Sequence, residues 1–443
     1  MSLPTADHVP GLPTLLLNAF EPSSIGYSID EYFLSGRAVS AASADEADYV
    51  TRIVVLMPDA RAFNGTVLVE WLNVSGGIDA PAIWRMASRE ITRSGFGYVA
   101  VSAQRVGVEG GASLLGADMS LKTQNLQRYS RLNHPGDAYA YDIFTQVGRL
   151  LKSGALDTVA PTSVLAIGES QSAMFLTTYV NEIDRDAAVY DGFLVHSRFG
   201  NAAPLDGRSP IESTEPAPYR DDLRVPVMTV ITETDLLDGR VLGYHRARRP
   251  DGQRCRTWEI AGAAHADNYV IRAGFVDSGS LSAGDLAAAF APTRQLLGTE
   301  LSYFINFGPQ HHYVLQAALA GLDAWVRTGE PAPSAELLQL TDDDPPALVT
   351  DAHGLARGGV RTPWVEVPVA RTSGTAPDES PMSFLFGSGE VFPTDTLTRL
   401  YPGGRAEYLD AFTLSLDAAI AAGHLLAADR AEIVELAGLG FPA

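Results

Sequence analysis

The chain has 443 residues, and its 32 lysines and arginines against 53 aspartates and glutamates give a formal net charge of −21 at pH 7. This charge repels phosphate backbones, so nucleic acid is not an expected partner. The 46% hydrophobic content excludes a disordered or fibrous chain. Cys255 is the only cysteine, which excludes internal disulfides and a cysteine-based zinc site.

No apolar run reaches the ~18 residues that a membrane span needs. The first ten residues lack the basic cluster and the apolar core of a signal peptide. We therefore expect a cytoplasmic protein with no membrane partner. The sequence leaves the oligomeric state open, and a homodimer is one option.

The first third of the chain predicts strands. Residues 25–36 and 49–58 are rich in β-branched and aromatic side chains, and Asn64-Gly65 is a turn signal. Residues 66–71 (TVLVEW) form a short, mostly apolar run. Such runs are typical of strands that are buried on both faces of a parallel sheet.

Beyond residue 80, strand and helix patterns alternate. The predicted helices are 81–94, 138–152, 172–180 and 241–248, and the predicted strands are 98–103, 163–167, 191–196, 225–232 and 255–260. This alternation predicts the α/β class, with a mostly parallel sheet and helices on both faces.

The remaining segments predict inserts and a C-terminal extension. Residues 197–222 and 267–309 interrupt the alternation and are expected to cover a pocket. Residues 313–328 form an amphipathic helix that Gly329 and Pro331 end. We expect a core over 1–330 and an extension over 331–443 that packs on the core and contributes to the lid, with an extended stretch at 360–370 and helix over 408–437.

The segment Gly168-Glu-Ser170-Gln-Ser172 carries the main chemical signal. It reads G-x-S-x-S between a buried strand and a helix, the position of a nucleophile elbow. The sharp turn requires small residues two before and two after the serine, and Gly168 and Ser172 meet that need. An ordinary strand-to-helix turn would also use these residues, so the placement carries more weight than the motif.

A serine hydroxyl needs a base, and the base needs an orienting carboxylate. Of the nine histidines, only His265 follows a predicted strand and a turn of small residues. The predicted strand at 225–232 is followed by two acids, Glu233 and Asp235. Asp235 lies at the loop distance that is usual for this role, so we prefer it, with Glu233 as the alternative acid. Ser170, Asp235 and His265 each follow a strand, and these ends meet at one edge of a parallel sheet.

The same edge supplies the other expected site residues. The backbone N–H of Gln171 is one expected oxyanion donor, and Leu72 or Asn73, after strand 66–71, supplies the other. Further candidates for substrate binding follow neighbouring strands: Gln104, His196 and Arg198. Arg198 would meet a substrate carboxylate, although an arginine at such a position more often pairs with a protein acid. The chain has no H-E-x-x-H or P-loop motif and no well-placed G-x-G-x-x-G, so we expect no metal and no cofactor.

Six segments resemble a little-characterised bacterial branch of the α/β-hydrolase superfamily, the "α/β hydrolase domain" proteins. They are VEWLNVSGG (69–77), VSAQRVGV (101–108), GESQSA (168–173), DGFLVHSR (191–198), HYVLQAALAGLDAWVRTGEPAP (312–333) and GGVRTPWVEVPVA (358–370). The resemblance runs along most of the chain, and the family's elbow also reads G-x-S-x-S. It implies an α/β-hydrolase fold and serine-dependent ester chemistry, without a defined substrate.

The sequence therefore predicts a serine carboxylic-ester hydrolase that forms an acyl-enzyme on Ser170 and acts on a small to medium, partly apolar ester or lactone. An acyltransferase with the same triad is the second hypothesis. The third is a hydrolase-like binding protein without turnover.

Overall fold

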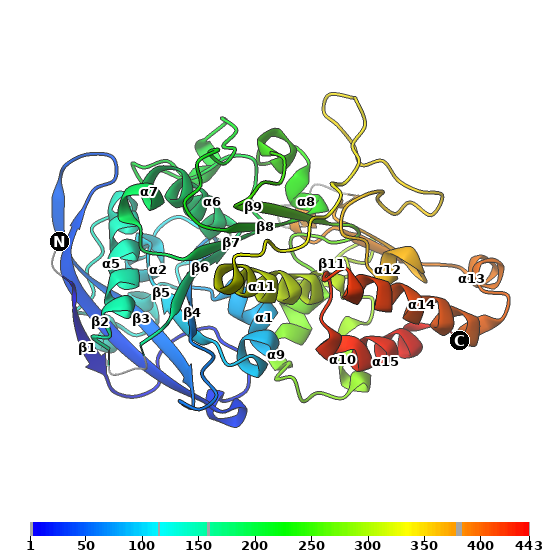
Figure 1. Ribbon diagram of the computed structural model, residues 1–443, viewed down its shortest axis with the longest axis horizontal. Coiled ribbons are helices and arrows are strands. Elements are labelled where there is room, and N and C mark those ends of the chain that lie inside the picture. The colour runs from blue at the N-terminus through cyan, green and yellow to red at the C-terminus, as the bar shows by residue number, and fades with distance from the viewer. Residues whose placement is uncertain (1–2, 114–115, 157–159, 378–382, 443) are drawn as a thin grey trace.

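A nine-stranded sheet runs through the computed structural model, which describes residues 3–113, 116–156, 160–377 and 383–442 (Figure 1). The strand order is β1-β2-β3-β5-β4-β6-β7-β8-β9. The bounds are β1 (Thr5–Val9), β2 (Tyr27–Val39), β3 (Glu46–Pro58), β4 (Thr66–Trp71), β5 (Gly97–Val101), β6 (Ser163–Glu169), β7 (Gly192–His196), β8 (Val227–Thr232) and β9 (Cys255–Ile260).

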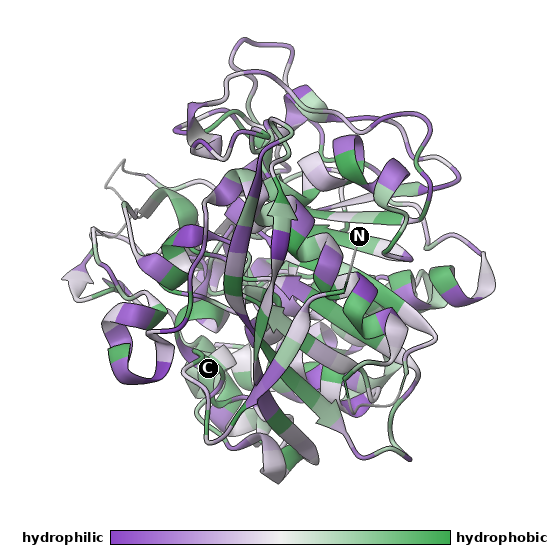
Figure 2. Cartoon of the chain, turned by 90° about the vertical axis from the view of Figure 1, so that its left-hand side faces the viewer, coloured by the Kyte–Doolittle hydropathy of each residue, from purple (hydrophilic) through white to green (hydrophobic). Residues whose placement is uncertain are grey.

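The two halves of the sheet differ in strand direction. The pairings β1–β2, β2–β3 and β3–β5 are antiparallel, and every pairing from β5 through β4, β6, β7 and β8 to β9 is parallel. Every residue of β4, β6, β7 and β8 is buried, whereas β2 mixes buried and exposed positions. Figure 2 shows this mixture of polar and apolar residues along the long strands at the N-terminal end. The difference is the one expected between a sheet covered on both faces and one partly open to solvent.

Alternate residues of the central strands enter two apolar cores. On β4, Leu68 packs in one core, and Val67 and Val69 pack in the other. Helices α1 (Ala82–Arg93) and α11 (Gln310–Thr328) cover the first face, and α5 (Ala140–Ser153) and α6 (Gln171–Thr178) cover the second. The predicted α/β class with helices on both faces is confirmed.

Shorter elements and the C-terminal helices complete the fold. The other helices are α2 (Arg105–Glu109), α3 (Leu121–Gln124), α4 (Leu126–Tyr129), α7 (Asp184–Ala187), α8 (Glu233–Leu236), α9 (Gly274–Val276), α10 (Ala283–Phe290), α12 (Pro363–Glu366), α13 (Thr394–Leu400), α14 (Gly404–Ala421) and α15 (Arg430–Gly440). The short strands are β10 (Gln295–Leu296), β11 (Thr299–Glu300), β12 (Ala370–Ser373) and β13 (Ser388–Val391). Helices α10, α14 and α15 lie together beyond one end of α11 (Figure 1).

The C-terminal segment contacts the sheet edge directly. Val360 forms a parallel bridge with Ile260 at the end of β9, and its N–H donates to Glu259 O at 2.7 Å. The division into a core over 1–330 and an extension over 331–443 stays a prediction. No helix in the described ranges has the length and the apolar run that crossing a bilayer requires.

Three local predictions are wrong, and one strand was missed. The predicted helix at 241–248 is only a four-residue 3-10 turn at Tyr244–Ala247. The stretch 360–370 is not continuously extended, because Pro363 opens the short helix α12. The helix over 408–437 is interrupted: α14 ends at Ala421, and Gly423 takes a positive φ of 78°. Strand β1, with exposed and half-buried residues, was not predicted.

Candidate active site

Ser170 occupies a strained turn between β6 and α6. Its φ of 57° and ψ of −119° are rare for a residue with a side chain, and such strain costs about 1–3 kcal/mol. The turn is held by the Ser170 N–H, which donates to His196 O at 3.0 Å, and by the Ser172 hydroxyl, which donates to Glu169 O at 2.8 Å. A Cβ at Gly168 would lie 2.9 Å from a Leu176 methyl carbon. The small residues therefore allow the backbone to hold the serine at the sheet edge.

His265 and Asp235 meet at the same edge, after β9 and β8. His265 Nδ1 lies 2.5 Å from Asp235 Oδ1, and both side chains are buried. The other carboxylate oxygen of Asp235 accepts hydrogen bonds from the Thr232 N–H and hydroxyl, both at 2.8 Å. The Phe199 ring stacks on the imidazole with 5.4 Å between centroids. These contacts fix the orientation of the His265 imidazole and of the Asp235 carboxylate before any ligand binds.

Two opposing effects set the protonation of His265. Burial lowers its pKa, but the Asp235 carboxylate, through its charge and its hydrogen bond, and more weakly Glu169, favour the imidazolium. The net result is a pKa above the ordinary histidine value. An imidazole of this kind stabilises the proton that it would take from a nucleophile.

Glu233 has a different set of partners. Its carboxylate accepts hydrogen bonds from the backbone N–H groups of Gly262 (2.6 Å) and Gly374 (2.7 Å) and from the Ser373 hydroxyl (3.0 Å). Burial raises the pKa of Glu233 to about 6. The residue joins the turn before His265 to the C-terminal segment, and the structure brings Asp235 rather than Glu233 to the imidazole.

Glu169, which sequence analysis did not single out, faces the second nitrogen of His265. Its Oε1 lies 3.4 Å from His265 Nε2, and its Oε2 accepts a hydrogen bond from Asn73 Nδ2 at 3.2 Å. Burial raises the pKa of this carboxyl group. Within the described ranges, the structure shows no hydrogen bond to the Ser170 hydroxyl. The sequence offered one signal for this residue. An acid directly precedes the expected nucleophile, at a position where a small or apolar side chain is easier to bury.

The expected oxyanion donors differ in availability. Gln171 is the first residue of α6, so its N–H has no helical acceptor. The N–H groups of Leu72 and Asn73 already donate to Val101 O (3.3 Å) and Ala80 O (3.0 Å). The next N–H, that of Val74, donates to the side-chain Oε1 of Gln171 at 3.3 Å, a contact that a rotation of this side chain would release.

Two of the predicted substrate-binding residues form hydrogen bonds within the protein, although Arg198 Nη1 has no partner among the described residues. The Gln104 carboxamide accepts from Trp71 Nε1 (3.1 Å) and donates to Asp137 (3.0 Å). Buried Arg198 donates to the carbonyls of Phe199 (2.9 Å) and Ala217 (2.8 Å) and thereby holds the 197–222 insert. A role for either in substrate binding stays a prediction.

His196 is buried directly behind the elbow. Its Nε2 lies 2.8 Å from Nε2 of His311, and its backbone carbonyl accepts from Ser170. Burial, together with His311, lowers the pKa of His196 well below the ordinary value. Its backbone carbonyl thus supports the elbow, and a role of His196 in substrate binding stays a prediction. The described residues contain no group of three or more His, Cys, Asp or Glu side chains arranged for a metal ion.

A pocket of about 180 Å³ lies beside the His265–Asp235 pair. Phe199, which stacks on His265, and Thr234, whose hydroxyl accepts from the His265 N–H at 3.1 Å, line it together with Leu237, Val241 and Phe384. Its walls are partly apolar and come from the loops after β7 and β8 and from the C-terminal segment.

Comparison with known proteins identifies the family of the chain. The family model of the alpha/beta hydrolase domain matches residues 2–435. The chain belongs to this family. No curated protein matches the chain.

Solved structures of three esterases are similar to parts of the α/β-hydrolase chain. An esterase of Pyrococcus furiosus is 10% identical, with a TM-score of 0.34 over 56% of this chain and 87% of the other. The esterase Est22 is 11% identical, with a TM-score of 0.31 over 47% and 65% of the two chains. A hyperthermophilic esterase of Pyrobaculum calidifontis is 11% identical, with a TM-score of 0.28 over 46% and 65%.

Proposed function

We propose that this α/β-hydrolase is a serine carboxylic-ester hydrolase. The observation that carries the proposal is the 2.5 Å contact between His265 Nδ1 and Asp235 Oδ1 at the sheet edge where Ser170 is held at a positive φ. A buried imidazole with one nitrogen fixed by a carboxylate is the arrangement that a serine nucleophile needs for activation. Membership of the family supports the same chemistry.

In the proposed reaction, the Ser170 hydroxyl oxygen attacks the ester carbonyl carbon while His265 Nε2 takes the hydroxyl proton. Asp235 keeps the Nδ1 proton in place and stabilises the imidazolium. His265 then returns the proton to the leaving alkoxide, which departs as an alcohol and leaves an acyl-enzyme. Water, activated by the same imidazole, attacks the acyl carbon and releases the carboxylic acid. No metal or organic cofactor takes part in these steps.

The tetrahedral intermediate needs two donors to its negatively charged oxygen. We assign them to the N–H of Gln171 and the N–H of Val74, rather than to Leu72 or Asn73, whose N–H groups are engaged by main-chain carbonyls. Release of Val74 from the Gln171 side chain would complete the oxyanion hole when substrate binds. Removal of one such donor costs about 3–4 kcal/mol of barrier.

Glu169 adds a second carboxyl group to the imidazole. Its Oε1 lies 3.4 Å from Nε2, the nitrogen that would take the proton of Ser170. We assign Glu169 the role of a positioning residue, which raises the pKa of His265 together with Asp235. Substrate must displace this contact before His265 acts as the base.

The size of the pocket beside Asp235 fits a small to medium substrate. Its apolar residues (Phe199, Leu237, Val241 and Phe384) suit a partly apolar acyl or alcohol group, and its polar wall includes Glu233, Asp238 and Arg240. The proposed substrate is therefore a small to medium, partly apolar carboxylic ester or lactone.

A fluorophosphonate probe and a panel of p-nitrophenyl esters test the proposal. The wild-type protein should be labelled and should release p-nitrophenol, and Ser170→Ala should do neither. Ser153→Ala, at the end of α5 on the surface, is the matched control and should retain both activities. No labelling and no hydrolysis by the wild-type protein would overturn the proposal and favour a binding protein, whereas an acylated added alcohol in the products would favour an acyltransferase.

A further inference from the structure

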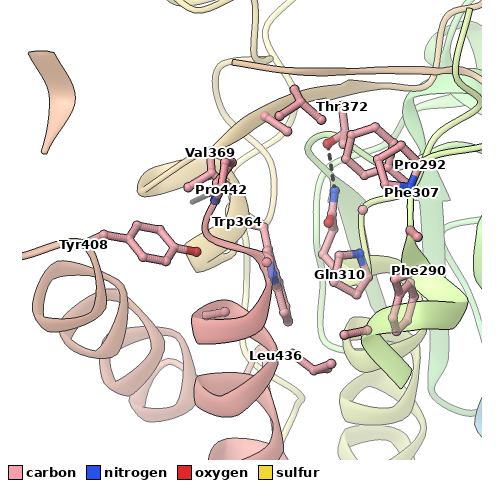
Figure 3. Close-up of a pocket in the computed structure, with 18 residues that line it drawn as sticks. Phe290, Pro292, Phe307, Gln310, Trp364, Val369, Thr372, Tyr408, Leu436 and Pro442 are labelled. Carbon is pink, nitrogen blue, oxygen red and sulfur yellow. Dashed lines mark hydrogen bonds between the residues drawn. The ribbon is translucent and has the colours of Figure 1, made fainter. Parts of the chain in front are cut away.

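A second cavity lies between the insert at residues 267–309 and the C-terminal helices. Its volume is about 260 Å³, and its walls come from α10, from residues 307–310 at the start of α11, and from α12, α14 and α15. Figure 3 shows Phe290 and Phe307 on one side of it and Tyr408 on the opposite side, with Trp364 and Gln310 between them. None of the residues to which we assign a catalytic role lines it.

The walls of this cavity carry no charge. In a chain of which 19% is charged, none of the eighteen described lining residues is Asp, Glu, Lys or Arg. Large apolar side chains form most of the surface: Phe290, Phe307, Trp364, Val369, Leu436 and Pro442. Burial of a charged ligand among these groups would be unfavourable, so the walls select a neutral molecule.

Only a few polar groups border the cavity. The Tyr408 side chain is buried among apolar residues, and its hydroxyl points towards the cavity in Figure 3. The structure shows no hydrogen bond to this hydroxyl within the described ranges. Gln310 is fully buried, and its Oε1 has no partner among the described residues. A ligand with one hydroxyl or carbonyl group has a place to form a hydrogen bond.

The cavity wall is bonded to the turn that carries His265. Gln310 Nε2 donates to Gly262 O at 2.7 Å and to Thr372 Oγ1 at 3.2 Å. The N–H of Gly262 donates in turn to Glu233, which also holds Ser373 beside Thr372. A molecule that packs against Gln310 and Thr372 therefore restrains residues 261–265.

We propose that this cavity is a binding site for a neutral, mostly apolar molecule with one hydrogen-bonding group, and that its occupant stabilises the turn before His265. An apolar cavity of about 150 Å³ holds one benzene. The larger volume here fits a bicyclic aromatic ring or a chain of similar bulk, and the four aromatic side chains that line the cavity favour a planar ring. The inference stands independently of the proposed hydrolase activity, because it rests on the cavity alone.

The test uses 1-naphthol as the neutral probe and naphthalene-1-sulfonate as its charged counterpart. Binding to the full chain is measured by fluorescence titration, and protection of residues 261–265 is measured by hydrogen exchange. We expect 1-naphthol to bind saturably, the sulfonate to bind at least tenfold more weakly, and exchange in this segment to slow when 1-naphthol is bound.

Filled-cavity variants locate the probe. Ala287→Phe fills the cavity from α10 and should weaken 1-naphthol binding at least tenfold, whereas Ala288→Phe, at the exposed neighbouring position, should not. Ala437→Leu fills it from α15, with Ala431→Leu as the exposed control, in case the first variant does not fold. Equal binding to filled and control variants, equal binding of the sulfonate, or unchanged exchange at 261–265 would each overturn the proposal.

Discussion

The two pockets of this molecule are built in opposite ways. At the sheet edge, buried carboxyl groups and imidazoles lie within hydrogen-bonding distance of one another, and short turns after β6, β8 and β9 hold each of them. In the cavity beside the C-terminal helices, apolar side chains meet without any charge. Buried titratable groups therefore lie at the sheet edge, where the backbone fixes them, whereas the added helices supply shape and hydrophobic surface.

The largest expected effect comes from the centre of the sheet edge. Ser170→Ala should lower kcat for ester hydrolysis about 10⁶-fold, because the proposed nucleophile is lost. The midpoint of thermal unfolding should change by no more than a few degrees, since the Ser170 hydroxyl makes no hydrogen bond within the described ranges. Steady-state kinetics and a melting curve measure both. A retained kcat would place the nucleophile elsewhere.

Substitution of the two acids after β8 should separate a catalytic role from a structural one at the sheet edge. Asp235→Asn should lower kcat about 10⁴-fold, because the amide no longer holds the Nδ1 proton and stabilises the imidazolium. Glu233→Gln should leave kcat within about tenfold but reduce the free energy of unfolding by about 1–3 kcal/mol, because three hydrogen bonds to Gly262, Ser373 and Gly374 are weakened. Kinetics and urea denaturation on both variants separate the roles. The reverse pattern would make Glu233 the orienting acid.

The pH–rate profile reports on Glu169. Since His265 must be neutral to act as a base and its pKa is raised, kcat/KM should fall as the pH drops through this raised value. Glu169→Gln removes one carboxyl group that raises the pKa of His265, so the acidic limb of the profile should move to lower pH. The neighbouring titratable groups are Asp235 and His311, which the substitution leaves in place. Glu169→Asp should restore part of the wild-type profile, and an unmoved limb would contradict the assigned role.

The smallest expected effect on catalysis concerns the 197–222 insert. Arg198→Lys should lower the free energy of unfolding by about 1–3 kcal/mol. Two different guanidinium nitrogens donate to Phe199 O and Ala217 O, and a lysine ammonium cannot reach both carbonyls in the same way. KM should change by less than threefold if the residue only anchors the insert. A large rise of KM for acidic esters alone, with unchanged stability, would support the sequence-based role of Arg198 in binding a substrate carboxylate.

Local sequence patterns predicted the elements that carry the site. The apolar run of β4 was predicted with the observed bounds, Thr66–Trp71, and the β6–α6 junction was placed at Ser170. Both depend on neighbours within a few residues, namely on apolar runs and on small residues at a sharp turn. The C-terminal helices were predicted less well, because the break between α14 and α15 contains only one glycine, Gly423, and a short 3-10 turn at Ala427–Asp429 within a helix-favouring stretch.

The choice between the two acids lay beyond local patterns. Glu233 and Asp235 belong to the four-residue helix α8, where residues two apart point to nearly opposite sides. Which side meets His265 depends on the packing of β9 and of residues 373–374 against that helix. The 3.4 Å contact of Glu169 with His265 and the engaged N–H groups of Leu72 and Asn73 likewise depend on chain segments far away in sequence.

The sequence by itself determined the α/β architecture and the elbow at Ser170, because periodic apolar runs and small residues act over short distances along the chain. Only the tertiary structure decided that Asp235 meets His265, that Glu169 lies on its other side, and that an uncharged cavity adjoins the same turn. These features depend on side chains brought together from strands and helices up to hundreds of residues apart, and the free energy of such contacts is fixed by packing rather than by local propensity.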